Sequence, residues 1–137
     1  MWKQKEIVLR PRKRGIHLIT NEIIQELPPL PGVGLLNLFI KHTSAALSVN
    51  ENADPDVRTD MEYILNRLVP DIDPKYVHTM EGPDDASSHS KTSLIGPSLT
   101  IPITRGRLNL GTWQGIYLLE FRESKSSRHI IATITGE

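Results

Sequence analysis

The chain has 137 residues, no cysteine, and 16 basic against 16 acidic residues. This length predicts a single domain with a core of its own, and the lack of cysteine excludes disulfides, thiolate metal ligands and a cysteine nucleophile. Zero net charge argues against general nucleic-acid binding, and no apolar run approaches the roughly 20 residues of a membrane-spanning helix. We therefore expect a cytoplasmic protein with neither nucleic-acid nor membrane partners.

In the first half of the chain, alternating and apolar runs predict strands at residues 2–10, 14–19, 35–42 and 46–50. The third of these strands has the clearest pattern, because Leu36, Leu38 and Ile40 fall on one of its faces. This pattern predicts that the strand is buried, either in the core or in an interface.

Two helices are predicted in the same half of the chain. Residues 20–27 form a short helix, which the two prolines that follow it stop. Asp54 and Pro55 start the second, because an aspartate can cap free N–H groups and a proline is tolerated at the first helical position. Apolar residues then recur on one helical face until Pro70 ends the helix.

Residues 71–93 are polar, rich in serine and aspartate, and predict a long loop that is either functional or disordered. Further strands are predicted at 98–103, 107–110, 113–121 and 129–135. The order of elements predicts one α+β domain, in which a mostly antiparallel sheet forms a flattened, barrel-like sandwich with two helices packed on it.

Three histidines are candidate metal ligands: His42 at the end of the apolar strand, and His78 and His89 on either side of an acidic loop segment. Imidazole and carboxylate are the usual ligands of Zn²⁺ when thiols are absent. The spacing of His78 and His89 matches no local metal motif, so a solvated loop with incidental histidines is the alternative. His17 and His129 lie in strand-like stretches and are interpreted as structural.

Other polar residues are candidates for catalysis or substrate binding. Glu51 is a candidate general base or a partner that orients a histidine, with a turn and capping role as the alternative. Trp113 and Gln114 would stack on a ring and bond its polar edge, unless Trp113 is a core residue beside a hairpin turn. Cationic and hydroxyl side chains that could meet a phosphate are Lys91, Ser93, Arg105, Arg107 and Thr112.

Taken together, these segments resemble the YjbQ family, which is usually labelled secondary thiamine-phosphate synthase. The resemblance covers nearly the whole chain, and its most specific parts as a set are the Gly-Thr-Trp-Gln turn and the His-Thr-Ser-Ala stretch. The matching segments in chain order are His42-Thr43-Ser44-Ala45-Ala46, Asn50-Glu51-Asn52, Asp54-Pro55, Glu81-Gly82, Asp84-Asp85, His89, Lys91, Ser93-Leu94, Gly96, Ile101-Pro102-Ile103, Gly106-Arg107, Gly111-Thr112-Trp113-Gln114, Glu120, Arg128 and Gly136-Glu137.

The resemblance implies a compact α+β homotrimer, with a pocket at the subunit interface and a bound metal in some members. It also implies a weak ability to replace thiamine-phosphate synthase, which joins a pyrimidine methyl pyrophosphate to a thiazole phosphate and releases pyrophosphate. The family name is a poor guide to the physiological substrate.

The first hypothesis is therefore a metal-assisted enzyme that acts on a phosphorylated small molecule. A divalent metal, Zn²⁺ or Mg²⁺, would be held by His42, His78 and His89. The catalytic candidates are Glu51, His42 and Gln114, and the substrate-binding candidates are Thr43, Ser44, Asn50, Lys91, Ser93, Arg107, Thr112 and Trp113. The second hypothesis is a non-enzymatic trimer that binds a small ligand, and the third is a mainly structural trimer.

Overall fold

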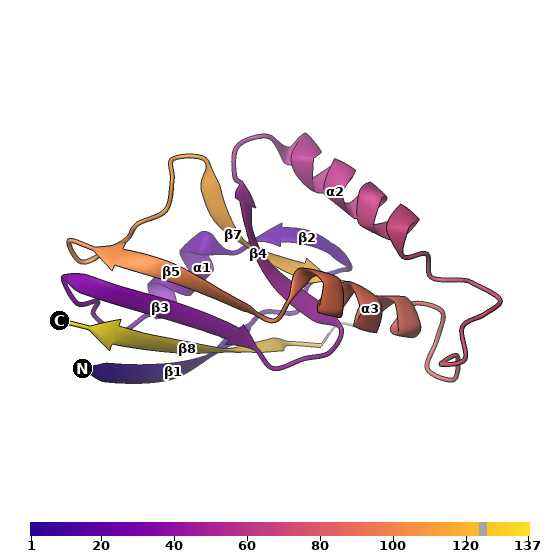
Figure 1. Ribbon diagram of the computed structural model, residues 1–137, viewed down its shortest axis with the longest axis horizontal. Helices are drawn as coiled ribbons and strands as arrows, with labels where there is room; N and C mark the ends of the chain where they lie inside the picture. The colour runs from indigo at the N-terminus through magenta and orange to yellow at the C-terminus, as the bar shows by residue number, and fades with distance from the viewer. Residues whose placement is uncertain (124–125) are drawn as a thin grey trace.

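A computed structural model describes residues 1–123 and 126–137, which form eight strands and three helices (Figure 1). The elements in chain order are β1 (Trp2–Leu9), β2 (Gly15–Leu18), α1 (Thr20–Glu26), β3 (Val33–Ile40), β4 (Ala45–Glu51), α2 (Pro55–Leu68), α3 (Asp85–Ile95), β5 (Ser98–Thr104), β6 (Arg107–Leu108), β7 (Gln114–Glu120) and β8 (Arg128–Gly136). The fold is α+β, as the sequence predicted.

The strands form two sheets, and every strand pairing among the described residues is antiparallel. One sheet has five strands in the order β1-β8-β3-β5-β6, and the other has three in the order β2-β7-β4. The main core contains residues from both sheets, for example Leu38 of β3 and Leu118 of β7, so the sheets share one apolar interior. This arrangement matches the predicted flattened sandwich.

The alternation predicted for β3 is confirmed. Leu36, Leu38 and Ile40 are buried, whereas Leu35 and Phe39 on the opposite face are 46% and 45% exposed. Successive side chains of a strand point to opposite faces, so a period of two separates a core face from an outer face. The outer face of the five-stranded sheet therefore carries large apolar side chains that nothing in the described chain covers.

Two helices agree with the sequence prediction. The short helix α1 buries Ile23 in the main core. At the start of α2, the side chain of Asp54 accepts a hydrogen bond from the backbone N–H of Asp56, and Pro55 is the first helical residue. Both features follow the ordinary rules for the N-terminus of a helix.

The third helix, α3, corrects the prediction of a continuous loop over residues 71–93. Its buried residues are Asp85, Ser87, Ser88 and Lys91, so the face that it turns inward is polar. The apolar period of 3.6 residues that identifies a buried helix face is therefore absent from the sequence. Ion pairs and hydrogen bonds hold the inward face of this helix, while Ile95 at its end packs against an apolar cluster.

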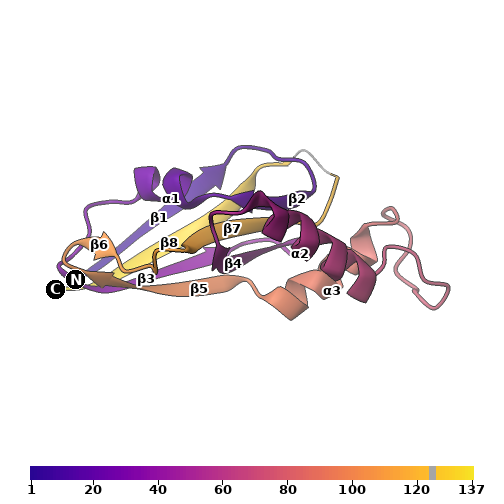
Figure 2. The ribbon, with the colours of Figure 1, turned by 90° about the horizontal axis from the view of Figure 1, so that it is seen from above.

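The helices α2 and α3 lie side by side at one end of the molecule, where α2 contacts β2 and α3 contacts β4 (Figures 1 and 2). A second small core beneath them includes Leu65 of α2 and Phe121. Among the described residues, no helix has the length and apolar character required to cross a bilayer.

Candidate metal centre

The structure divides the predicted site residues between the two ends of β4. The segment from His42 to Ser44 leads into the strand, beside α3, and Glu51 ends it, beside the β6–β7 connection that contains Trp113 (Figure 1). Six residue steps at about 3.3 Å each separate the ends by about 20 Å. Within one chain, these residues therefore form two separate groups.

At the α3 end, His78, Asp85 and His89 form a group that could hold a metal ion, and their ligand atoms all lie within 4.8 Å of one another. Asp85 and His89 are one helical turn apart on α3, and His78 comes from the segment between α2 and α3. His89 Nε2 lies 3.0 Å from Asp85 Oδ2, and His78 Nε2 contacts the same oxygen. Asp85 is only 1% exposed, so this carboxylate is buried at the base of the group.

The hydrogen bonds of His89 define its tautomer. Its Nδ1 lies 2.6 Å from the backbone carbonyl of Thr43, and a carbonyl can only accept, so the proton is on Nδ1. In the neutral ring, the lone pair of Nε2 then points at Asp85 Oδ2, which has only lone pairs to offer when ionised. A cation, either a second proton or a metal ion, is required between these two atoms.

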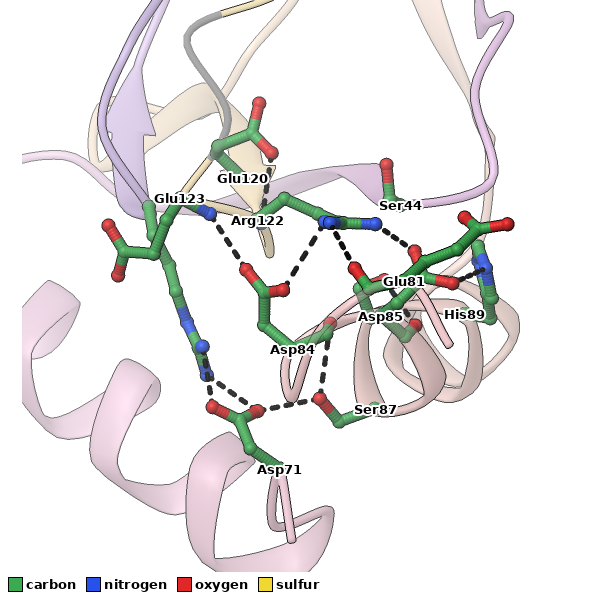
Figure 3. A network of polar contacts seen from close by, with 12 residues as sticks. Ser44, Asp71, Glu81, Asp84, Asp85, Ser87, His89, Glu120, Arg122 and Glu123 are labelled. Carbon is green, nitrogen blue, oxygen red and sulfur yellow. Dashed lines mark hydrogen bonds and ion pairs between the residues drawn. The ribbon is translucent and has the colours of Figure 1, made fainter. Parts of the chain in front are cut away.

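Asp85 is held in its ionised form by the groups around it. Burial by itself would raise the pKa of this carboxyl, but His78, His89 and Arg122 outweigh that effect and hold the pKa below its usual value. Arg122 Nη1 donates to Oδ1, the oxygen that faces away from the histidines (Figure 3). Because Oδ1 is already engaged, Oδ2 is the oxygen that remains for a metal ion.

Arg122 also ties the start of α3 to the chain beyond β7. Its Nη2 donates to the carbonyl of Glu81 at 3.0 Å, and its Nε lies 3.4 Å from Asp84 Oδ1, an ion pair rather than an aligned hydrogen bond (Figure 3). The backbone N–H of Glu123 donates to Asp84 Oδ2 at 2.9 Å. These contacts fix the orientation of the helix that carries two of the three candidate ligands.

A second set of contacts ties α3 to α2 and to the start of β2. Arg14 Nη1 donates to Asp71 Oδ2 at 2.7 Å. Ser87 donates to the other carboxylate oxygen of Asp71 at 2.6 Å (Figure 3). Arg14 also donates to Asn66 on α2. Arg14 and Asp71 therefore connect α3 to α2 and to the residue that precedes β2.

The connection between β3 and β4 is anchored by a buried ion pair. Glu120 and Arg128 are almost fully buried, and both carboxylate oxygens of Glu120 accept from the guanidinium group. Arg128 Nη2 also donates to Ser44 Oγ at 2.9 Å. Ser44, a predicted substrate-binding residue, is therefore engaged in this network, and its neighbour Thr43 presents its carbonyl to His89.

A pocket of about 660 Å³ lies beside His89. Its walls come from the end of β3 and the residues after it, from α3, and from the α3–β5 connection, and its lining residues are Phe39, Ile40, Lys41, His42, Thr43, His89, Thr92, Ser93 and Pro97. Four of the predicted site residues thus meet in one pocket, and its volume is in the range of small-molecule sites. A second pocket of about 390 Å³ is lined by both His78 and His89.

His42 lies in the first pocket but not in the metal-ligand group of the described residues. Its Nε2 accepts the backbone N–H of His129 at 2.8 Å. Burial, followed by the charges of Arg128 and His129, lowers the pKa of His42. The group therefore contains Asp85 in the position that the sequence analysis gave to His42.

Lys91 does not face either of the pockets that His89 lines. It is 1% exposed, its Nζ donates to Asn66 Oδ1, and it lies 5.6 Å from the centre of the Phe121 ring. Burial first, and then the charge of Arg14, lower the pKa of Lys91. This side chain connects α3 to α2 rather than facing a substrate phosphate.

The group at the far end of β4 is engaged in local hydrogen bonds. Glu51 Oε2 accepts the backbone N–H of Asp54, and Gln114 Oε1 accepts that of Gly111 at 2.7 Å. Asn50 accepts a hydrogen bond from the backbone N–H of Glu51. Trp113 is 65% exposed, the carbonyl of Thr112 accepts from Asn52, and Arg107 is exposed on β6.

Asp85 was noted only as one of the acids between His78 and His89, and neither Asp85 nor Arg122 was predicted to belong to the site. Asp85 and His89 have the i, i+4 spacing of one helical face, but this signal is meaningful only once α3 is known to be a helix. Arg122 comes from a segment 37 residues further on, and no local pattern links it to Asp85.

Comparisons with known proteins agree with this architecture. A model of the family described as UPF0047 protein YjbQ-like matches residues 5–137. The UPF0047 proteins YjbQ of Escherichia coli O157:H7 and Salmonella typhimurium are 50% and 52% identical, each over the full length of both chains. A conserved hypothetical protein of Thermus thermophilus is 32% identical, with a TM-score of 0.81 over 93% of this chain and 97% of its own.

A YbjQ-like protein of unknown function from Sulfolobus solfataricus P2 shares the fold, with a TM-score of 0.86 at 23% identity over 100% of this chain and 99% of its own. Fold and site together define an α+β protein with two antiparallel sheets and a histidine–aspartate centre at one end. The chain belongs to the UPF0047 protein YjbQ-like family.

Proposed function

We propose that this chain is a metal-dependent enzyme that acts on a phosphorylated small molecule, with His78, Asp85 and His89 as the metal ligands. One observation carries the proposal. The Nε2 lone pair of His89 points at a buried carboxylate oxygen, and His78 approaches that oxygen from a different segment. Two imidazoles that converge on one buried carboxylate oxygen form the donor set of a metal site, and a metal ion can take the place of the second proton between His89 Nε2 and that oxygen.

The chemistry of the donor atoms favours zinc. Two imidazole nitrogens and one carboxylate oxygen are typical of catalytic Zn²⁺ sites, which keep a fourth position for water or substrate. Magnesium prefers a shell made of oxygen atoms, so the second ion of the sequence analysis suits this group less well. The two pockets that His89 lines, of about 390 Å³ and about 660 Å³, would give substrate access to the fourth position.

Bound zinc would polarise a phosphoryl oxygen and stabilise negative charge on a leaving group. The protein's own residues prepare the ligand atoms for that role. The carbonyl of Thr43 holds the Nδ1 proton of His89, and Arg122 engages Oδ1 of Asp85. His89 and Asp85 therefore each present one defined atom, which is the role of outer hydrogen bonds in other metal sites.

The family resemblance suggests which reaction to assay first. We propose a weak thiamine-phosphate synthase-like activity, in which a pyrimidine methyl pyrophosphate is joined to a thiazole phosphate. Pyrophosphate leaves in this reaction, and a metal ion can stabilise its charge. A neutral chain without cysteine is compatible with the cytoplasmic location that we predict.

We further propose that the chain works as a homotrimer. The outer face of the five-stranded sheet exposes Leu35 and Phe39, and Phe39 also lines the pocket beside His89. A subunit packed on this face would cover apolar surface and border the pocket. In such a trimer, we propose that the residues around Gln114 of one chain lie next to the metal centre of another.

The metal proposal is tested by elemental analysis of the purified, zinc-replete protein. We expect close to one zinc ion per chain in the wild type and a large loss in His89→Ala. The matched control is His17→Ala, because His17 is also a half-buried histidine bonded to a carbonyl, that of Lys13, but lies outside the group. It should bind zinc like the wild type.

Zinc that persists in both His89→Ala and Asp85→Ala would overturn the ligand assignment. Turnover of the two thiamine precursors is then compared in the zinc-loaded wild type and in His89→Ala. Tight binding of a precursor without turnover would support the second hypothesis, a ligand-binding trimer, because the same pocket would serve both functions.

A further inference from the structure

His42 lies where β3 of the five-stranded sheet ends, in the wall of the larger of the two pockets that His89 lines. It follows β3, it lines the pocket of about 660 Å³ with His89, and its ring centre lies 5.9 Å from that of His129. From the sequence, His42 is a candidate both for a metal ligand and for a catalytic residue. A metal ligand or a general base requires an unprotonated ring nitrogen that is free to bind a metal ion or to accept a proton.

The hydrogen bond from His129 leaves no such nitrogen. A backbone N–H can only donate, so Nε2 of His42, which lies 2.8 Å from the nitrogen of His129, contributes its lone pair. The proton of the neutral ring is therefore on Nδ1. Among residues 1–123 and 126–137, no acceptor is bonded to this Nδ1. His42 thus lines the pocket with one unused donor and no free lone pair.

The composition of the pocket indicates what this donor would meet. None of the nine lining residues is acidic, while Lys41 and the hydroxyl groups of Thr43 and Ser93 add further donors. The hydroxyl of Thr92 is already used, since it donates to the carbonyl of Ala45 at 3.4 Å. Lys41 is paired with Glu6 at 3.2 Å, on the outer face of the sheet. Phe39, Ile40 and Pro97 supply apolar walls. An anionic group attached to a flat apolar body matches these walls and donors.

We propose that His42 is a fixed hydrogen-bond donor, through Nδ1–H, to an anionic oxygen of the ligand in this pocket, and that it is neither a metal ligand nor a general base. The backbone N–H of His129 is the group that fixes the tautomer. The ligand class, a phosphate ester with an apolar body, rests on the proposed function. The tautomer depends only on the hydrogen bond within this chain.

The tautomer is tested first, by nitrogen-15 NMR of the histidine rings in the metal-free wild-type protein. We expect Nδ1 of His42 to carry the proton and Nε2 to be unprotonated, and we expect both signals to keep this pattern when zinc is added. A proton on Nε2, or a zinc-induced change typical of a metal-bound nitrogen of His42, would overturn the proposal.

Two substitutions then separate the two nitrogens. In His42→Gln, the side-chain oxygen can replace the Nε2 acceptor, but the donor at Nδ1 is lost. In His42→Asn, the amide N–H₂ can replace the Nδ1 donor, but the acceptor for His129 is lost. The first variant should keep the fold and lose the contact to ligand, whereas the second should keep that contact and unfold at a lower temperature.

The probe is phenyl phosphate, titrated into the zinc-loaded proteins. We expect His42→Gln to bind it about tenfold more weakly than the wild type, because a hydrogen bond to a charged oxygen is lost. His42→Asn should bind it close to the wild-type level, and both variants should keep their zinc. The proposal is wrong if His42→Gln binds the probe as tightly as the wild type, or if the zinc-loaded wild type does not bind it.

Failure of the proposed function would be recognised separately. A wild-type protein without zinc would contradict the metal centre, while the NMR pattern of His42 would still decide its tautomer.

Discussion

At the scale of single residues, the buried ion pair of Glu120 and Arg128 holds the β3–β4 connection, which contacts the candidate metal ligand His89. Both oxygens of Glu120 accept from Arg128, which also reaches Ser44 in the β3–β4 connection. The next residue back, Thr43, orients His89. A charge pair buried this deeply is costly to break, because removal of one partner leaves the other desolvated and uncompensated.

We therefore predict that Glu120→Gln lowers the free energy of unfolding by about 3 kcal/mol. The control is Glu26→Gln, which removes one partner of the Lys5–Glu26 pair on the surface. Exposed pairs contribute little, so its effect should be far smaller. Urea unfolding of the metal-free proteins measures both changes, and equal effects would contradict the role of burial.

At the scale of elements, α3 differs from the other helices because its buried face is polar. Asp85 and Ser87 on that face are hydrogen-bonded to neighbouring segments. Lys91 on the same face differs from Asp85 and Ser87, because burial lowers its pKa and thereby disfavours its charged form. Its charged end lies 5.6 Å from the centre of the Phe121 ring, and we expect that charge to contribute little net stability.

From this we expect Lys91→Met to change the free energy of unfolding by less than about 1 kcal/mol, because it keeps the volume and removes a buried charge. Lys91→Ala should cost about 2–4 kcal/mol, since it leaves a cavity between α3 and α2. Thermal unfolding with calorimetry distinguishes the two variants. If methionine proved as costly as alanine, the charge of Lys91 and not its volume would hold α3 in place.

At the scale of the whole molecule, the outer face of the five-stranded sheet exposes large apolar side chains of its central strand, β3. Leu35 lies in the middle of this face, on β3, which pairs with β5 on one side and β8 on the other. Large exposed apolar surfaces mark interaction sites. This is the surface on which we expect the proposed trimer to form.

Sedimentation velocity should give a species of three times the 15.4 kDa chain mass for the wild type. Leu35→Lys places a charge on the proposed interface and should shift the protein to smaller species. Tyr63→Lys is the matched control, because Tyr63 is also exposed but lies on α2. A monomeric wild type, or a trimer that Leu35→Lys leaves intact, would contradict this assignment of the interface.

Several features of the fold could be predicted because their causes are local. The period-two pattern of Leu36, Leu38 and Ile40 identified a core strand, and Asp54 with Pro55 identified the start of α2. In each case, neighbouring residues carry the whole signal, since backbone geometry determines which side chains share a face or cap an end. The family could be predicted for the same reason, because its motifs are short segments in a set order.

The composition of the centre could not be predicted in this way. Sequence by itself determined the strands, two helices, the family and the candidacy of His78 and His89. Only the tertiary structure decided that residues 85–95 form a helix, that Asp85 joins these histidines, and that the backbone of His129 engages His42. The physical reason is that these outcomes depend on hydrogen bonds between segments far apart in the chain, and no local periodicity encodes such partners.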